Sequence, residues 1–558
     1  MDFSHALIEA IAQHRAGDRD AVLTSCRTVL ESVPDHPIAL RLMGLASDDA
    51  TEALGWLTRA HAAAPDHPPT ALALALAHLR DGDADTALAI AGAITRENPS
   101  LAAGWFVAGS ALSALHRGPE AIAALTRAQA LDPAHAETAA NLGNAYLDAD
   151  DLDAALTWLR RAVALDPGQT EAWASLGFLF AATGQCAAAV AACDAARRQQ
   201  PEFGVARWNR AYALLLAGAW TRAWPDFQWH WADWQPEQMP AGPRWDGSAC
   251  DKLLVLAEQG LGDAIHFSRY LPALAARMDV TLVCRRSQHA LFRELPVRLL
   301  PPEATLPDCP WINLMGLPGL LGTTPTTVPT PSGWLGQPVR PPYHPPGAGP
   351  RVGLVWRGNP AHSNDRRRSL PTESLRPLLA VPCVEFISLQ VGPLAHEAES
   401  VLGLANLGAS LRDWGGTRDL VATCDLIVSA DTATAHLAGA MGIPTWIMLP
   451  FMPDWRWGVG RENTPWYDSV RLFRQPRPGD WASVVTAIAA ALKTQGAAGT
   501  ARQRATLRWC SPSVFANACP PDPSATKYKS SVTSGFATAA SDARPGLAIG
   551  PAGSPGTV

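Results

Sequence analysis

The chain of 558 residues lacks paired cysteines, long apolar runs and an excess of basic charge. Its ten cysteines are scattered from Cys26 to Cys519 with no C-x-x-C pair, which argues against a structural zinc site and a disulfide framework. No run of about 18 apolar residues occurs, and the N-terminus has no basic segment followed by an apolar one. We therefore expect a cytoplasmic protein with no integral membrane segment.

Charge and composition narrow the class of protein further. The formal net charge of −6 gives no excess of positive charge of the kind that binds nucleic acid, so we expect no nucleic-acid partner. Hydrophobic residues make up 47% of the chain and charged residues 17%, which is a globular composition. Because the chain exceeds the length that one hydrophobic core supports, several domains are expected.

A regular period runs through the first two-fifths of the chain. It is marked by five equally spaced prolines: Pro65, Pro99, Pro133, Pro167 and Pro201. Within each period, small and apolar residues recur at helical spacing in two segments, the second of which ends at the proline. The pattern predicts a solenoid of paired amphipathic helices.

The best-preserved units resemble the tetratricopeptide family at Trp173, Leu176, Gly177, Phe180, Ala189, Ala196 and Pro201, and one period earlier at Leu142, Gly143, Tyr146, Ala155, Ala162 and Pro167. The match is specific over about 65–217, and we assign 1–217 to the solenoid. The interval from Pro34 to Pro65 is shorter than the later ones, so the first repeats are expected to be degenerate. The resemblance implies a groove that binds a protein or peptide segment, with a rigid spacer or a dimerisation surface as the alternative.

The fold class is expected to change after about residue 218, where a tryptophan-rich stretch connects the solenoid to another pattern. The run KLLVL (252–256), a glycine-bearing turn, a helical segment and the run DVTLVC predict a βαβ unit of a parallel sheet. A proline-rich stretch over about 324–350 predicts a boundary, beyond which buried-strand runs restart. The predicted parts are an α/β Rossmann-like lobe with its connector at 218–340, a second Rossmann-like lobe at 350–495 and a disordered tail at 496–558.

The first candidate site follows the first predicted strand, where open parallel sheets bind ligands. It contains Gln259, Gly260, Gly262 and Asp263. The glycines allow a tight turn and the close approach of a ligand. Asp263 starts the next predicted helix, so its carboxylate is predicted to cap that helix, to act as a general base, or to do both.

The second candidate site follows the strand run DLIVSA. Asp431, Thr432, Ala433, Thr434 and His436 lead there into a helix of small residues. Backbone N–H groups at such a helix start form an anion site suited to a diphosphate, and the two threonine hydroxyls add donors. His436 lies on the first turn, where it either contacts the diphosphate or packs against the neighbouring strand.

The third candidate site follows the strand run RVGLVW. Arg357 comes directly after it, then Asn359, and then a basic run that includes Arg366 and Arg368. Guanidinium groups beside a strand end bind phosphate well, although a charge run also forms a solvated surface. We favour phosphate binding, and the sequence leaves open which arginine faces the site.

Residues 250–492 resemble the ADP-heptose heptosyltransferase family and its tetratricopeptide-linked relatives. In that family a G-x-G-D-like turn supplies the catalytic aspartate, which corresponds to Asp263, and a D-T-x-x-x-H segment binds the donor. That segment corresponds to Asp431, Thr432 and His436. Further matches are the segments FISLQVGP, LPFMPDWRW, TPWY and RLFRQP. The residues predicted to line the cleft are Gln259, Gly260, Gly262, Asn359, Gln390, Asp454, Trp455 and Arg456.

The resemblance implies a GT-B fold and a glycosyltransferase that moves a sugar to a hydroxyl acceptor by inverting displacement. A nucleotide-diphosphate sugar would be the co-substrate, with no metal and no other cofactor. The absence of a D-x-D motif after residue 250 agrees with metal independence. Two features depart from the family. Ala433 stands where a glycine is common, and no lysine follows the strand run RVGLVW, so the identity of the donor stays open.

Two other functions stay open as well. A non-catalytic adaptor would bind a partner through the solenoid and carry degenerate or nucleotide-sensing lobes. A sugar-nucleotide epimerase or hydrolase would use the same lobes without an acceptor. The acceptor of a transferase is also open, because the solenoid suggests a protein, by analogy with repeat-bearing O-linked glucosaminyltransferases, whereas the lobes suggest a glycan such as lipopolysaccharide.

Overall fold

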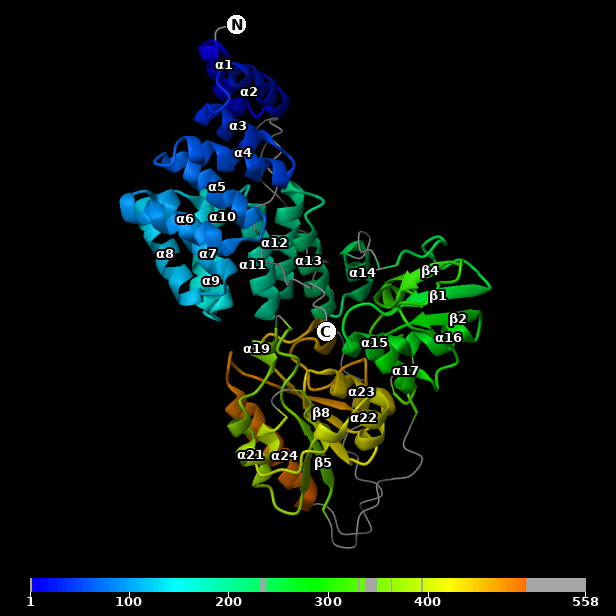
Figure 1. Ribbon diagram of the computed structural model, residues 1–558. Helices are drawn as coiled ribbons and strands as arrows, with labels where there is room; N and C mark the ends of the chain where they lie inside the picture. The colour runs from blue at the N-terminus through cyan, green and yellow to red at the C-terminus, as the bar shows by residue number, and fades with distance from the viewer. Residues whose placement is uncertain are drawn as a thin grey trace, which may run out of the picture. The chain divides into compact units, whose positions relative to one another are not determined.

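A computed structural model of the chain describes residues 3–230, 236, 238–329, 332–336, 349–362, 364–392 and 395–497. These residues fold as two compact units (Figure 1). Among the described residues, the first unit runs to Leu179 and includes Ala192–Ala206, and the second includes Phe180–Ala191 and the chain from Arg207 to residue 497. The disordered tail predicted at 496–558 lies outside the described residues beyond position 497.

Ten consecutive helices lie wholly in the first unit. They are α1 (Phe3–Ala16), α2 (Arg19–Ser32), α3 (Pro37–Ala46), α4 (Ala50–Ala63), α5 (Pro68–Arg80), α6 (Ala84–Glu97), α7 (Ala102–Ala114), α8 (Gly118–Leu131), α9 (Ala136–Asp148) and α10 (Leu152–Leu165). Each helix packs against the next one along the chain. The helical solenoid predicted from the proline period is therefore confirmed.

Glycines at the repeating position allow the two helices of a pair to approach. A Cβ atom added at Gly109 would lie 2.5 Å from Cγ of Leu125, and one added at Gly143 would lie 2.7 Å from Cγ of Leu159. Because each leucine belongs to the second helix of the pair, only a residue without a side chain fits at this contact. The sequence repeats because this packing contact repeats.

A shorter α3 explains the irregular spacing of the first prolines. α3 has ten residues, whereas the corresponding helix α5 has 13. This difference accounts for the shortened interval between Pro34 and Pro65. A Cβ added at Gly44 would still lie 2.6 Å from Cγ of Leu57. The repeat formed by α3 and α4 therefore keeps the helix-pair contact and lacks nearly one turn of helix.

The first part of the tryptophan-rich stretch, predicted as a connector, is a helix. The helical region ends with α11 (Thr170–Ala182), α12 (Cys186–Gln199), α13 (Gly204–Leu216) and α14 (Trp220–His230). Trp220 stacks on Trp466 with ring centroids 4.6 Å apart, and the indole N–H of Trp224 donates to the carbonyl oxygen of Thr323 at 2.6 Å. Large aromatic residues replace the small repeat residues here because α14 packs against the α/β part of its unit rather than against another repeat.

A four-stranded parallel sheet follows, in the order β3-β2-β1-β4. Its strands are β1 (Lys252–Leu256), β2 (Asp279–Val283), β3 (Arg298–Leu300) and β4 (Trp311–Asn313), and its helices are α15 (Leu261–Phe267), α16 (Leu271–Ala275), α17 (Arg286–Phe292) and α18 (Leu317–Leu320). β1 pairs with β2 on one side and with β4 on the other, so the strand order reverses beside β1. The loops after β1 and β4 meet at this point.

The second sheet has five parallel strands in the order β6-β5-β7-β8-β9. Its strands are β5 (Arg351–Val355), β6 (Glu385–Ser388), β7 (Leu426–Ala430), β8 (Thr445–Leu449) and β9 (Val470–Arg474), and its helices are α19 (Asp365–Arg368), α20 (Arg376–Leu379), α21 (Glu397–Ser400), α22 (Trp414–Val421), α23 (Ala433–Met441) and α24 (Trp481–Ala497). Ile427 and Val428 belong to different hydrophobic clusters because alternate side chains of a strand point to opposite faces.

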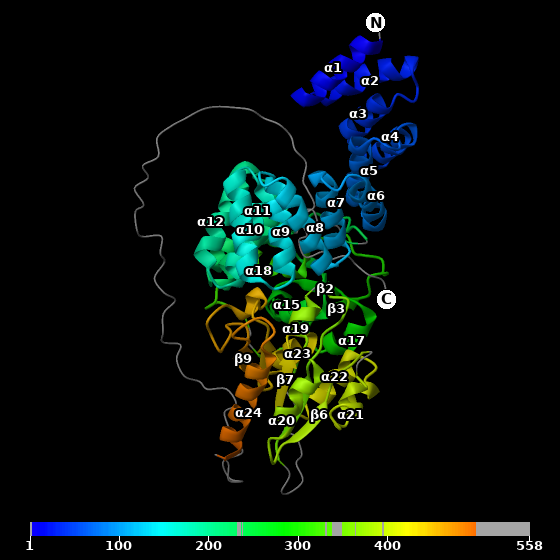
Figure 2. The same cartoon turned by 90° about the vertical axis from the view of Figure 1, so that its left-hand side faces the viewer.

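Helices cover both faces of this second sheet (Figure 2). The α/β class predicted for the chain after the solenoid is confirmed. At 17 residues, α24 is the longest described helix, and none of the described helices is long and apolar enough to cross a membrane.

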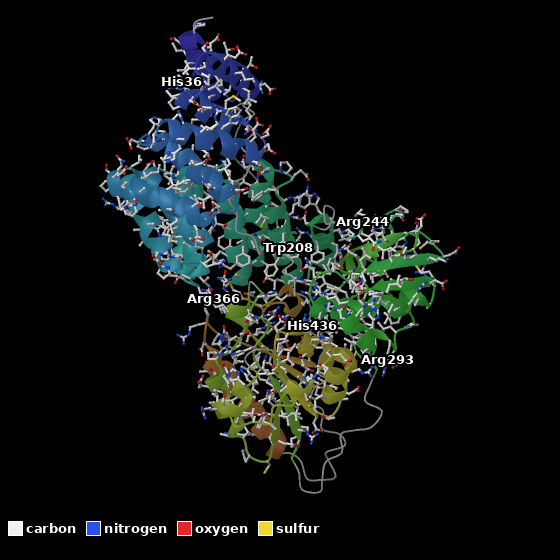
Figure 3. The ribbon with its side chains drawn as sticks, viewed as in Figure 1. His36, Trp208, Arg244, Arg293, Arg366 and His436 are labelled. Atoms are coloured by element: carbon white, nitrogen blue, oxygen red, sulfur yellow. The ribbon has the colours of Figure 1, made fainter. Side chains whose placement is uncertain are left out.

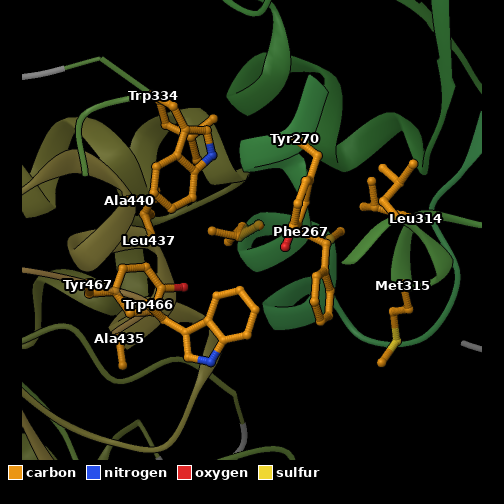
Figure 4. Close-up of a cluster of buried hydrophobic side chains, with 14 of the residues drawn as sticks. Phe267, Tyr270, Leu314, Met315, Trp334, Ala435, Leu437, Ala440, Trp466 and Tyr467 are labelled. Carbon is orange, nitrogen blue, oxygen red and sulfur yellow. The ribbon is translucent and has the colours of Figure 1, made fainter. Parts of the chain in front are cut away.

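The two sheets share one hydrophobic core in the second unit (Figure 4). α15, which follows β1, packs against α23, which follows β7. Phe267 of α15 and Leu437 of α23 contribute to this core, and the rings of Trp466 and Tyr467 complete it. The core therefore brings the carboxyl ends of β1 and β7 toward each other.

Candidate functional site

The loops that follow β1, β5, β7 and β8 converge in the second unit. Asp263, after β1, accepts a hydrogen bond from Arg456, which follows β8. Arg368, after β5, donates to the backbone carbonyl oxygen of Asp431, which follows β7, at 3.2 Å. β5 and β7 are neighbours at the point where the order of the second sheet reverses, which is where open parallel sheets usually bind ligands.

Arg456 occupies the centre of this convergence between two carboxylates. Its guanidinium donates to Oδ1 of Asp263 at 2.5 Å and to Oδ1 of Asp454 at 2.8 Å. Burial acts to lower the pKa of Arg456, but the carboxylates of Asp454 and Asp263 outweigh it and raise that pKa. Nε of Arg456 is buried and has no hydrogen-bond partner among the described residues. The guanidinium is therefore permanently charged and keeps one donor unused.

Asp263 is the third residue of α15 rather than its first. Its Oδ2 accepts from the backbone N–H of Gly260, the residue that precedes the helix, at 3.2 Å. The carboxylate thus stabilises the helix start and also pairs with Arg456. Burial raises the pKa of Asp263 above its usual range, against the lowering effect of Arg456, while 27% of the side chain stays exposed. A carboxylate with a raised pKa that keeps access to solvent suits a general base.

Asp431 is held in place by its neighbours. Its Oδ2 accepts from the indole N–H of Trp457 at 2.9 Å, and its Oδ1 lies 3.8 Å from Nε2 of His436. Burial and the nearby Asp454 raise the pKa of Asp431 to about 6. The ring of Trp457 also stacks on that of His436, with centroids 5.3 Å apart.

α23 begins beside these side chains. Thr432 precedes the helix in extended conformation, and its hydroxyl lies 3.1 Å from the hydroxyl of Ser429 instead of capping the helix. The N–H groups of Ala433 and Thr434 occupy the first turn, where no helical carbonyl precedes them. The Thr434 side chain is buried. The helix start therefore offers backbone donors and the positive end of the helix dipole to an anion.

Among the arginines of the basic run, Arg368 faces this helix start. Besides its bond to Asp431, its Nε donates to Oδ1 of Asp365 at 3.3 Å. A Cβ added at Gly358 would lie 2.6 Å from the Arg368 guanidinium, so the guanidinium passes directly against the backbone. Arg366 is exposed, and its position is labelled in Figure 3 together with that of His436.

Three of the predicted site residues, Gln390, Arg357 and Asn359, contact groups other than the charged residues around Arg456. Gln390 is buried, and its amide bonds to backbone groups of Trp356, Arg357 and Val391. The Arg357 guanidinium lies 3.5 Å from Glu397. Asn359 is exposed and accepts from the N–H of Ala361 in a local turn.

Trp455 is 3% exposed and packs edge-on against Trp224, Phe227 and Trp466 in the aromatic core. In this structure the Trp455 ring therefore contributes to the aromatic core.

The turn after β1 combines strain with a close contact. Gln259 is exposed and has a φ of 64°, which is unusual for a residue other than glycine. Gly260 follows it and donates to Asp263. A Cβ added at Gly262 would lie 3.1 Å from Cδ2 of His436. The second glycine of the motif thus leaves room for the close approach of α15 to α23.

Sequence reasoning missed three buried residues that connect the two sheets. The hydroxyl of Tyr467 lies 2.8 Å from Nδ1 of His266 and 2.8 Å from Nδ1 of His436. Arg269 donates to the carbonyl oxygens of His266 and Trp466, and it lies over the rings of Trp334 and Tyr467. The TPWY segment was the only sequence signal for Tyr467, and its contacts could not be read from it.

Glu258 joins the loops of the first sheet. Its carboxylate accepts from the Asn313 side chain at 3.0 Å and from the backbone N–H groups of Leu314 and Met315, both at 2.9 Å. Burial raises the pKa of Glu258 to about 7. This carboxylate lies where the strand order of the first sheet reverses. Its hydrogen bonds to Asn313, Leu314 and Met315 hold the segment after β1, which leads to Asp263, in place.

Groups of three or more His, Cys, Asp or Glu side chains placed to hold a metal ion do not occur in the described part of the chain. The charged groups that face the site are Asp263, Asp431, Asp454, Arg368 and Arg456.

Family models match the helical part of the chain. The tetratricopeptide repeat matches residues 112–177 and 176–228, and anaphase-promoting complex, cyclosome, subunit 3 matches residues 47–128. The chain therefore carries tetratricopeptide repeats over about residues 47–228, which confirms the predicted repeats and includes α14.

One curated relative covers most of the chain. It is protein FlbA from Caulobacter vibrioides, 27% identical over an alignment of 537 positions that covers 87% of this chain and 83% of that protein. Among solved structures, a thermophilic tetratricopeptide repeat protein from Thermus thermophilus is 26% identical, with 32% of this chain and 97% of that chain covered and a TM-score of 0.30. MamA from Desulfovibrio magneticus RS-1 is 20% identical, with 30% and 98% covered and a TM-score of 0.27.

Proposed function

We propose that the second unit is a glycosyltransferase of GT-B type, which moves a sugar from a nucleotide-diphosphate donor to a hydroxyl acceptor by inverting displacement. The observation that supports it most is the convergence of an accessible carboxylate, an inward-facing arginine and a helix start at the carboxyl ends of parallel strands. These three features supply a base, a phosphate ligand and an anion site.

In this proposal the donor diphosphate binds at the start of α23. Arg368 lies against the backbone of Asp431 there, and His436 occupies the fourth position of the helix. Their donors, with the N–H groups of the first turn, would stabilise the negative charge that develops on the departing nucleoside diphosphate. The same contacts would hold the sugar's anomeric carbon near Asp263.

Asp263 is the proposed base that takes the proton from the acceptor hydroxyl. Its carboxylate is paired with Arg456, which would weaken it as a base. Asp454 is the second partner of the same guanidinium. A donor phosphate that competes for Arg456 would therefore free Asp263 while Asp454 still holds the arginine. Donor binding would then activate the base, which gives a reason for the two-carboxylate arrangement.

The acceptor is proposed to be a protein or a glycan. The repeats over about 47–228 are of the kind that bind protein segments, which favours a protein acceptor or a protein partner. We propose that the protein acts in the cytoplasm.

The proposal is tested with the full chain and a panel of UDP-, ADP-, GDP- and dTDP-sugars. One nucleotide class is expected to raise the melting temperature of the wild type by mass action. Arg368→Gln should abolish this shift, whereas Arg293→Gln should leave it unchanged, because Arg293 is exposed and pairs with its neighbour Glu294. Figure 3 labels Arg293.

Turnover separates the remaining alternatives. Asp263→Asn is expected to keep the thermal shift and to lower the rate of nucleoside diphosphate release about 100-fold or more. Release that requires an added acceptor indicates a transferase. Release or isomerisation without an acceptor indicates the hydrolase or epimerase.

A second candidate function is a non-catalytic adaptor. The pairing of Asp263 with Arg456 favours it, because the charges of the site already satisfy each other without a ligand. The repeats would then carry the whole activity by binding a partner segment. If none of the four nucleotide classes changes the melting temperature at millimolar concentration, the adaptor is the better interpretation.

A further inference from the structure

The hydroxyl of Tyr467 lies between two buried histidines from different elements. It is 2.8 Å from Nδ1 of His266 in α15 and 2.8 Å from Nδ1 of His436 in α23. The exposed fractions of the three residues are 1% for Tyr467, 0% for His266 and 7% for His436. Three titratable side chains therefore form one hydrogen-bonded chain with little access to water.

The protons shared by Tyr467 and the two histidines can be counted. Burial, reinforced by the positive charges of Arg269 and Arg456, lowers the pKa of both histidines well below its usual value. Each imidazole is therefore neutral at pH 7 and carries one proton. The phenol also has one proton, and in this buried site that proton is paired only if the hydroxyl donates to one Nδ1 and accepts from the other. One histidine must then be protonated at Nδ1 and the other at Nε2.

The surroundings of the two Nε2 atoms decide which histidine is which. Nε2 of His266 is buried and has no hydrogen-bond partner among the described residues, so a proton placed there would be an orphaned donor. Nε2 of His436 lies 3.8 Å from the carboxylate of Asp431, where a proton is stabilised and a lone pair is repelled. Both arguments place a proton on Nδ1 of His266 and on Nε2 of His436.

We propose that His266 and Tyr467 are positioning residues that fix His436 as the Nε2-protonated tautomer. His266 donates to the Tyr467 hydroxyl, which in turn donates to Nδ1 of His436. The Nε2–H group of His436 then points away from Tyr467 and lies beside Asp431. The assignment of the ligand as a donor diphosphate rests on the proposed function. The tautomer itself does not.

This arrangement makes His436 a hydrogen-bond donor that carries no charge. A neutral N–H near Arg368 and Arg456 binds a phosphate oxygen without adding a third positive charge to the site. Hydrogen bonds in series polarise one another, so each bond in the chain strengthens the next. The sequence separation of 201 residues between His266 and Tyr467 means that this donor is set only when both sheets are in place.

The test is nitrogen NMR of the full chain with 15N-labelled histidine and no nucleotide, with His436→Asn and His266→Asn spectra for assignment. The expected result is a protonated Nε2 and an unprotonated Nδ1 for His436, and the reverse for His266. A protonated Nδ1 on His436 would overturn the inference.

Two tyrosine variants separate positioning from packing. Tyr467→Phe should leave His436 as a mixture of tautomers and weaken binding of the stabilising nucleotide about tenfold. Tyr270→Phe is the matched control, because Tyr270 is also buried and its hydroxyl bonds to Thr323, at 2.9 Å, rather than to a histidine. It should change neither property. Equal effects of the two variants on the His436 signals would contradict the inference.

The two proposals fail in different ways. If no nucleotide binds but His436 has the expected tautomer, the proposed function fails and the positioning role of Tyr467 stands. If a nucleotide binds but Tyr467→Phe leaves the tautomer of His436 unchanged, the positioning role fails and the proposed function stands.

Discussion

At the scale of single residues, two carboxylates that follow β1 closely, Glu258 in the loop and Asp263 in the first turn of α15, have different surroundings. Glu258 is 6% exposed and accepts three hydrogen bonds, from Asn313 at the end of β4 and from the two residues that follow it. Asp263 is partly exposed and pairs with an arginine across the site. The first carboxylate therefore supports the loop, and the second one is available for chemistry.

The raised pKa of Glu258 predicts a dependence of stability on pH. Its pKa is about 7 in the folded chain, against 4.5 for the ordinary group. Between these values the folded state binds the proton and the unfolded state does not, so stability falls as the pH rises from about 4.5 to 7. Above pH 7 this contribution is constant. The loss is on the order of 3 kcal/mol.

The Glu258→Gln variant isolates this contribution from those of other groups. It should be less stable than the wild type at low pH, because one backbone N–H loses its acceptor, but it should lack the loss between pH 4.5 and 7. The measurement is the difference in melting temperature between the two proteins from pH 4.5 to 8. A constant difference over that range would show that Glu258 does not titrate there.

The sequence identified the residues that follow strands, because a motif and a strand end lie close together in the chain. Asp263, Asp431 and His436 were found in this way. It could not identify Tyr467, whose partner His266 is 201 residues away. Nor could it show which arginine of the basic run faces the site, because that depends on a turn of the backbone past Gly358.

At the scale of helices and strands, glycines have two different roles. Gly55 lies on the exposed side of α4, where an added Cβ would meet no atom within 4 Å, whereas Gly109 of α7 lies against Leu125. Gly55 therefore lowers the stability of α4, whereas Gly109 is required by the packing of α7 against α8.

Alanine at these two positions should therefore have opposite effects. Gly55→Ala should stabilise the helical region by about 0.5–1 kcal/mol, because alanine favours the helix. Gly109→Ala should destabilise it by about 1–3 kcal/mol, because the new methyl group overlaps Leu125. Thermal unfolding followed by circular dichroism measures both. Destabilisation by Gly55→Ala, or none by Gly109→Ala, would show that the helix pairs differ from those described.

The helix pairs could be predicted because one packing contact recurs in several repeats, at Gly44, Gly109 and Gly143, and leaves a periodic signal. α14 could not, because its neighbours come from the α/β part of the chain and impose no such period. Its residues Trp220 and Trp224 contact Trp466 and Thr323 instead.

At the scale of the molecule, the core of the second unit extends into the helical region. Leu214 and Leu216 of α13 and Phe227 of α14 belong to the same hydrophobic cluster as Ile447 of β8. The hydroxyl of Tyr212 also donates to the carbonyl oxygen of Pro453 at 2.5 Å. The boundary predicted at residue 217 from the end of the period therefore falls inside this core.

Two fragments test where the second unit begins. A fragment of residues 170–558, which keeps α11 to α14, should unfold cooperatively in urea. A fragment of residues 218–558 lacks α13 and exposes apolar core surface, so it should aggregate or lose its cooperative transition. Tryptophan fluorescence follows both transitions. Equal cooperativity of the two fragments would mean that α13 does not contribute to this core.

The contact between Gly262 and His436 also constrains how this chain can change by inheritance. A Cβ at position 262 would lie 3.1 Å from Cδ2 of the imidazole, so a larger residue there requires a shift of His436 and is expected to be disfavoured while the histidine is present. Loss of the histidine removes that obstacle. Among descendants of this chain, replacement of His436 by a smaller residue is therefore expected to come before replacement of Gly262.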